Sequence, residues 1–177
     1  MNRSALLILT ASLAGVVQAQ SPVSLMITAQ KTVYNNAKNN WLKTAEKMPE
    51  GDYNYKPTPE VQTFAERVAH MANQIGGCSR VRGEQKQNPA AGKTSKADLT
   101  AALKASFDEC DAAWETMNDT SAMELMAGGR GGQAPKLQTL VQNNVHLNEV
   151  YGATAVYLRL KGLVPPSTAQ AAPPPRR

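Results

Sequence analysis

Apolar residues recur along this chain at steps of three and four, the period of an amphipathic α-helix. Four segments carry such a stripe, at roughly 23–48, 63–78, 95–117 and 135–161. In the first of them the residues predicted to face the core are Met26, Val33, Ala37, Trp41, Ala45 and Met48. No segment alternates apolar and polar residues convincingly, as a half-buried strand would. The pattern predicts an all-α protein built as a four-helix bundle.

Local signals mark where these helices begin and end. Thr63 and Glu66 have the spacing of a capping box at the start of the second segment. Gly162 suits a C-terminal cap after the fourth segment. The pair Gly76–Gly77 lies inside the second stripe, where two glycines are expected to weaken or bend a helix.

Two further stretches lack a helical period. The Gly-rich sequence AGGRGGQ at 127–133 predicts a flexible connection, since it lacks the strand-to-helix context of a phosphate-binding loop. The tail at 164–177, VPPSTAQAAPPPRR, is rich in Pro and Ala and is expected to be extended and disordered.

The first 19 residues have the layout of a secretory signal peptide. Arg3 supplies a positive start, residues 5–17 are apolar, and Val17-Gln18-Ala19 is a cleavage signal of small residues. Cleavage near Ala19 would leave a bundle domain at 20–163 in an exported protein, periplasmic or secreted. An uncleaved membrane anchor is the alternative, although the apolar run is shorter than the span of about 20 residues that a bilayer requires.

The net charge and its distribution indicate which kinds of partner to expect. The formal net charge is +5 for the whole chain and becomes +4 once Arg3 is removed. No block of Lys and Arg forms a basic patch, so nucleic acid is not an expected partner. Nothing after the N-terminal segment resembles a membrane span, so no membrane association is expected after cleavage. A small molecule of unknown identity is the expected ligand. The sequence is compatible with either a monomer or a homodimer.

The two cysteines, Cys78 and Cys110, both fall on predicted core stripes. In an oxidising compartment such a pair is expected to form a disulfide. It would close a loop of about 30 residues and stabilise the fold by about 3–4 kcal/mol in the chain-entropy account. Two buried free thiols are the alternative.

The chain has two histidines, His70 and His146, on the second and fourth predicted helices. Each flanks an apolar stripe, where a side chain would line a groove between neighbouring helices. Two imidazoles from different helices suit a shared Zn, Ni, Cu or Fe ion. Surface or packed histidines are the ordinary alternative, and spacing alone does not decide between them.

Three longer stretches bear on that question, and together they resemble one known family. They are TAEKMPEGDYNYKPTPEVQTFAERVAHMANQ at 44–74, TSKADLTAALKASFDECDAAW at 94–114 and NNVHLNEVYGATAVYLRLKGLVPP at 143–166. In their order they resemble the DinB-like family of four-helix metal-binding proteins. The resemblance covers nearly all of the chain after the signal segment and implies a four-helix bundle.

The same resemblance implies a metal held by three histidines, one from the second helix and two from an H-x-x-x-H pair on the fourth. His70 matches the first and His146 the second, but Val150 stands at the third position. Residues four apart share one face of a helix, so a His there would converge with His146 on one ion. Valine has no lone pair, and a metal bound here would therefore lack one of the three imidazole ligands.

Three hypotheses follow for the divalent metal, Zn or Ni. The site is lost, or it survives on two histidines with water and a carboxylate, or another group such as Asn73 completes it. Glu149, three residues after His146, is the nearest acidic side chain on that helix and suits an outer contact to the imidazole.

The function expected is therefore an exported DinB-like domain of unassigned activity with a reduced or lost metal site. The alternative is a weak metal-dependent hydrolase or thiol S-transferase-like enzyme that uses His70 and His146. No nucleophile motif is present that could replace the metal site. Whether the protein is an enzyme therefore depends on whether two histidines hold a metal, which the sequence does not decide.

We expect the exported protein to begin at Gln20. Intact-mass spectrometry of protein recovered from the periplasm or medium checks this. Full-length protein that starts at Met1 and sediments with membranes would instead indicate a tethered bundle.

Overall fold

The computed structural model describes residues 20–74, 76–85, 88–128 and 131–171. The predicted signal peptide and residues 172–177 of the predicted tail lie outside them. The elements are α1 (Pro22–Lys47), the 3-10 helix η1 (Glu50–Asp52), α2 (Phe64–Gln74), α3 (Gly76–Val81), α4 (Lys96–Glu115), α5 (Asp119–Met123), β1 (Leu125–Ala127), β2 (Gln133–Pro135), α6 (Lys136–Leu160) and α7 (Pro166–Ala171).

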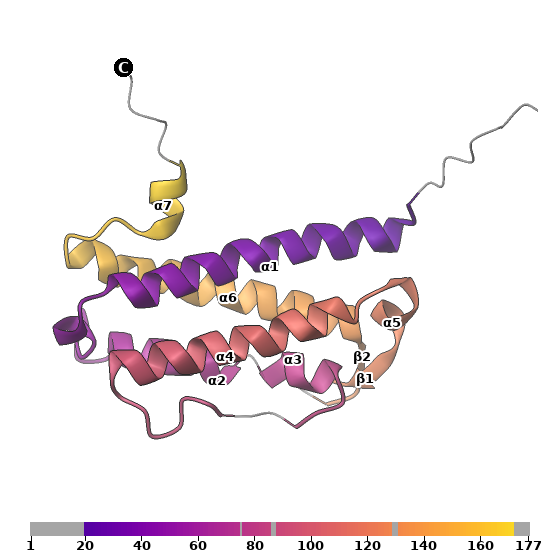
Figure 1. Ribbon diagram of the computed structural model, residues 1–177, viewed down its shortest axis with the longest axis horizontal. Coiled ribbons are helices and arrows are strands. Elements are labelled where there is room, and N and C mark those ends of the chain that lie inside the picture. The colour runs from indigo at the N-terminus through magenta and orange to yellow at the C-terminus, as the bar shows by residue number, and fades with distance from the viewer. Residues whose placement is uncertain (1–19, 75, 86–87, 129–130, 172–177) are drawn as a thin grey trace, which may run out of the picture.

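The long helices form a four-helix bundle, as the periodicity predicts (Figure 1). Helix α1 packs against α4 and α6, and the pair α2 and α3 packs against the same two helices from the opposite side. Buried polar groups join the layers: the Trp41 indole N–H donates to the Leu147 carbonyl at 2.9 Å, and the Ser106 hydroxyl donates to the Ala72 carbonyl at 2.8 Å. None of the described helices is long and apolar enough to cross a membrane.

The buried face of α1 differs from the prediction in its first half. Ala37, Trp41 and Ala45 are buried as expected, but Met26 and Val33 are 52% and 41% exposed. Their neighbours Ile27 and Tyr34 are buried in their place, as part of the stripe Ile27, Tyr34, Ala37, Trp41, Ala45 and Met48. The sequence alone did not favour this rotation, because the buried Tyr34 hydroxyl finds its partners on α4.

Those partners are the Phe107 carbonyl at 3.0 Å and the Asp111 carboxylate at 2.8 Å. Burial and the neighbouring carboxylate raise the pKa of Tyr34 well above its usual range. Its hydroxyl therefore stays protonated and donates, which satisfies a polar group that would otherwise cost free energy in the core.

The second predicted helix is two helices. α2 begins with the expected capping box, in which the Thr63 N–H donates to Glu66 at 2.7 Å and the Glu66 N–H donates to the Thr63 hydroxyl at 3.2 Å. It is described to Gln74, and α3 spans Gly76–Val81. Gly76 and Gly77 are the first two described residues of α3.

A short hairpin, which the sequence did not predict, flanks the Gly-rich stretch before α6, and the flexibility expected of that stretch stays a prediction. Leu125, Met126 and Ala127 pair antiparallel with Pro135, Ala134 and Gln133, as a hairpin next to the start of α6. Strands of three residues are too short to show an alternation in the sequence.

The expectation of an extended tail is wrong for Pro166–Ala171, which forms α7. The Ser167 N–H donates to the Tyr151 hydroxyl at 3.0 Å, and that hydroxyl donates to the Ser167 hydroxyl at 2.9 Å. This polar contact with α6, together with the buried Pro165 and Pro166, holds the segment against the bundle. A periodicity search does not detect a six-residue helix of this composition.

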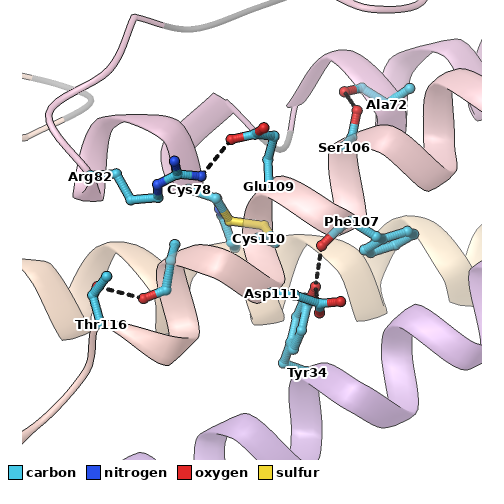
Figure 2. Close-up of a disulfide and its surroundings, with 12 residues drawn as sticks. Tyr34, Ala72, Cys78, Arg82, Ser106, Phe107, Glu109, Cys110, Asp111 and Thr116 are labelled. Carbon is cyan, nitrogen blue, oxygen red and sulfur yellow. Dashed lines mark hydrogen bonds and ion pairs between the residues drawn. A yellow bond between two sulfur atoms is a disulfide. The ribbon is translucent and has the colours of Figure 1, made fainter.

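Cys78 and Cys110 form a disulfide between α3 and α4, as expected (Figure 2). Both cysteines are buried, and they are 32 residues apart in the chain. This covalent link fastens α3 to α4.

Replacing both Cys78 and Cys110 by Ala should therefore lower the free energy of unfolding by about 3–4 kcal/mol, because the unfolded chain gains conformational entropy without the cross-link. Urea denaturation followed by circular dichroism measures the change. The reduced wild type should behave like the double variant, and equal unfolding midpoints of oxidised wild type and variant would contradict the account.

Candidate functional site

His70 on α2 and His146 on α6 face each other across the groove between these helices. Their Nε2 atoms are 3.1 Å apart, and the ring planes cross at 73°. Both side chains are half-buried. The structure therefore brings together the two histidines that the sequence singled out, although they lie 76 positions apart.

Val150 follows His146 by one helical turn and is part of the core. Its exposed fraction is 9%, and it belongs to the same buried apolar cluster as Leu147 and Tyr151. An aliphatic side chain here contributes packing and offers no electron pair. The position where the resemblance implied a third imidazole is thus filled by a residue that stabilises the fold.

Glu149 contacts His146 from the solvent side. Its Oε2 lies 3.4 Å from Nδ1 of His146, the nitrogen that faces away from His70. A carboxylate favours a proton on the nitrogen beside it, which leaves the lone pair on Nε2. Glu149 therefore lies on the side of His146 that faces away from His70, and it does not approach the space between the rings.

Asn73 does not complete the pair either. Its side-chain oxygen accepts a hydrogen bond from the Ala90 N–H at 3.0 Å, which holds the loop before α4. Among the described residues, no group of three or more His, Cys, Asp and Glu is arranged to hold a metal ion.

The two histidines open onto a cleft of about 890 Å³ between α2, α3, the hairpin and α6. Five of its other described lining residues carry a neutral carboxamide, Asn143 and the four glutamines Gln74, Gln133, Gln138 and Gln142. Arg80 and Glu149 carry the charges. The volume is sufficient for a small organic molecule.

The sequence reasoning missed all of this lining except the histidines and Glu149. Gln and Arg on helical surfaces are ordinary solvent-facing residues, and only the fold brings these to one cleft. The glycine pair at 76–77 was the signal available, because two glycines in a helix indicate a break or a close approach.

That close approach is observed at Gly77. A side chain there would have its Cβ only 3.0 Å from both polar atoms of the Asn143 carboxamide on α6. The Asn143 amide in turn donates to the Cys78 sulfur at 3.2 Å. Glycine thus allows α3 to lie directly on α6 and to form one wall of the cleft.

Comparison with known proteins assigns the family. Residues 34–151 match the family model of the DinB superfamily. The chain belongs to the DinB superfamily. Among curated proteins, none matches it in sequence.

Solved structures of DinB-like proteins share the fold. One from Bacillus cereus is 15% identical with a TM-score of 0.67, and the match covers 79% of this chain and 95% of that one. Another, from Bacillus subtilis, is 18% identical with a TM-score of 0.60 over 76% of this chain and 92% of the other. A mycothiol-dependent maleylpyruvate isomerase is 14% identical with a TM-score of 0.55; the match covers 70% of this chain and 60% of the isomerase.

The residues of this DinB domain fit a metal only in part. Two nitrogens on one tetrahedral zinc at about 2.0–2.1 Å lie about 3.3–3.4 Å apart, close to the 3.1 Å between the two Nε2 atoms. A catalytic zinc site normally has three protein ligands, and here the third position is an aliphatic core residue. The chain therefore offers two of the three protein ligands that a catalytic zinc normally has.

The tautomers of the pair can be tested directly. With Nδ1 of His146 protonated beside Glu149, we expect its Nε2 to accept a hydrogen bond from Nε2–H of His70. Long-range ¹⁵N–¹H NMR of the neutral imidazoles reports which nitrogen carries each proton. Glu149→Ala should increase the Nε2–H population of His146, whereas a wild-type His146 that already carries its proton on Nε2 would contradict the assignment.

Proposed function

We propose that this protein is an exported DinB-like domain that binds a small polar molecule in the cleft beside His70 and His146. In this proposal the histidine pair is a reduced metal site, which holds a divalent ion more weakly than three imidazoles would. The proposal rests on one observation above others. The two imidazoles meet at 3.1 Å and line a cleft that also carries five carboxamides, while Val150 is packed into the core.

Binding is favoured over metal catalysis by the number of ligands. A bound divalent ion would act as a Lewis acid on water or a thiol, and such sites depend on a firmly held ion. Two neutral imidazoles with solvent in the remaining positions hold an ion weakly. What the described side chains themselves offer is orientation, because the carboxamides of the cleft can hydrogen-bond a ligand.

A second candidate is a metal-dependent hydrolase or thiol S-transferase-like enzyme that uses His70 and His146. The spacing of the two Nε2 atoms supports it, because that spacing is near the separation of two ligands on one ion. The likeness to the isomerase supports only a shared fold, since the two sequences are 14% identical.

Export is part of the proposal because of the signal-like segment at 1–19 and the cysteine pair. The disulfide between Cys78 and Cys110 agrees with an oxidising compartment.

Calorimetric titration with Zn²⁺ and Ni²⁺ tests the state of the site. We expect the wild type to bind one ion with a dissociation constant weaker than about 1 µM, and His70→Ala or His146→Ala to abolish binding. Val150→His supplies a third imidazole on the same helical face and should tighten zinc binding by about tenfold or more.

Val150→Phe is the matched control, since it introduces a ring of similar size without a lone pair. It should leave zinc affinity unchanged. Binding of wild type at nanomolar zinc would favour the enzyme candidate. Zinc affinity that is equal in Val150→His and Val150→Phe would contradict the assignment of residue 150 to the missing ligand position.

A further inference from the structure

Arg80 is the one cationic side chain, apart from the histidines, among the described residues that line the cleft. It lies on α3, two residues after Cys78, and is half-buried. Across the part of the chain that the structure describes, no carboxylate lies within salt-bridge distance of its guanidinium. A partly desolvated guanidinium is stabilised by an anion, so its surroundings favour an anionic ligand.

From this geometry we propose that the cleft binds a small carboxylate, with Arg80 as the residue that holds the carboxylate group. This inference rests on the proposed function, because it names the chemical class of the molecule bound beside the histidine pair. It assigns Arg80 a binding role and makes no claim about a reaction.

The neighbouring Arg82 shows what a structurally paired arginine looks like in the same segment. Its guanidinium contacts Glu84 at 2.6 Å and Glu109 at 2.8 Å, the latter visible in Figure 2. Both nearby carboxylates are thus used by Arg82, which does not line the cleft. Arg80, two residues earlier, faces the cleft.

The charge distribution in the cleft agrees with this ligand class. Glu149 is the one acidic side chain among the described lining residues, and its carboxylate approaches the Nδ1 side of His146. A ligand carboxylate near Arg80 therefore meets a cation and a set of neutral amides. A single guanidinium matches one planar carboxylate through two parallel hydrogen bonds, whereas phosphate sites usually combine several donors or charges.

The glutamine side chains of the cleft indicate which other groups the ligand carries. The four glutamines of the cleft each present a carbonyl oxygen and an NH₂ group, and no hydrogen bond to another described residue engages these side chains. Such groups recognise neutral amide and hydroxyl groups through paired donors and acceptors. The class proposed is therefore a carboxylate joined to neutral amide or hydroxyl groups, as in an acylated amino acid.

N-Acetylglycine is a suitable probe, and N-acetylglycinamide is its neutral counterpart. NMR titrations of ¹⁵N-labelled protein would follow the amides of the cleft residues for wild type, Arg80→Gln and Arg82→Gln. We expect N-acetylglycine to bind wild type at least about tenfold more tightly than N-acetylglycinamide does, from the hydrogen bonds to a charged group. Arg80→Gln should remove this preference.

Arg82→Gln is the matched control, because it removes the same charge from the same segment but outside the cleft. It should keep the preference for N-acetylglycine. An equal loss in both variants would mean that only net charge matters, and no cleft shifts in the wild type, or equal binding of the two probes, would likewise overturn the proposal. Inorganic phosphate binding more tightly than N-acetylglycine at Arg80 would overturn the assignment to a carboxylate.

The same samples separate this inference from the proposed function. Zinc titration depends on the two histidines and should be unchanged in Arg80→Gln. If N-acetylglycine fails to bind while the zinc results follow expectation, the ligand class is wrong and the reduced site stands. If N-acetylglycine binds through Arg80 but zinc binds independently of both histidines, the proposed site is wrong and the carboxylate cleft stands.

Discussion

The close contact of α3 with α6 is the constraint on which the cleft depends. Gly77 lets the two helices approach until its Cα hydrogen faces the Asn143 carboxamide, and the disulfide from Cys78 to Cys110 fastens the same short helix to α4. Without these two contacts, Arg80 would have no fixed position, and the cleft would lose one wall.

The cleft takes its side chains from both parts of the second predicted helix. His70 lies on α2, opposite His146 on α6, and Arg80 lies on α3. The imidazole pair and the arginine therefore come from different helices, which together line one cleft with α6.

Much of the fold follows from helical periodicity, and the failures have physical causes. In α4, which lies within the apolar stripe predicted at 95–117, Leu99, Leu103 and Phe107 are buried. In α1 the choice between Val33 and Tyr34 depends on hydrogen bonds to α4, which lies more than 70 residues away in the chain. Elements of three to six residues, such as the hairpin and α7, are too short to produce a period at all.

The candidate site likewise contains residues that the sequence indicates and residues that only the fold reveals. The closeness of His70, His146 and Glu149 could be inferred from the sequence, because histidine is rare in this chain and the spacing matches a known pattern. The loss of a ligand at Val150 stays a prediction. The glutamines and Arg80 could not be inferred, since they are common surface residues until the fold brings them together.

A crystal structure of the protein soaked in zinc tests the central claim most directly. The account predicts one ion bound by Nε2 of His70 and Nε2 of His146, with oxygen ligands from solvent or a carboxylate additive in the remaining positions and Val150 still packed in the core. An ion bound by a third side chain of the same chain, or zinc found elsewhere while the two imidazoles remain hydrogen-bonded to each other, would contradict it.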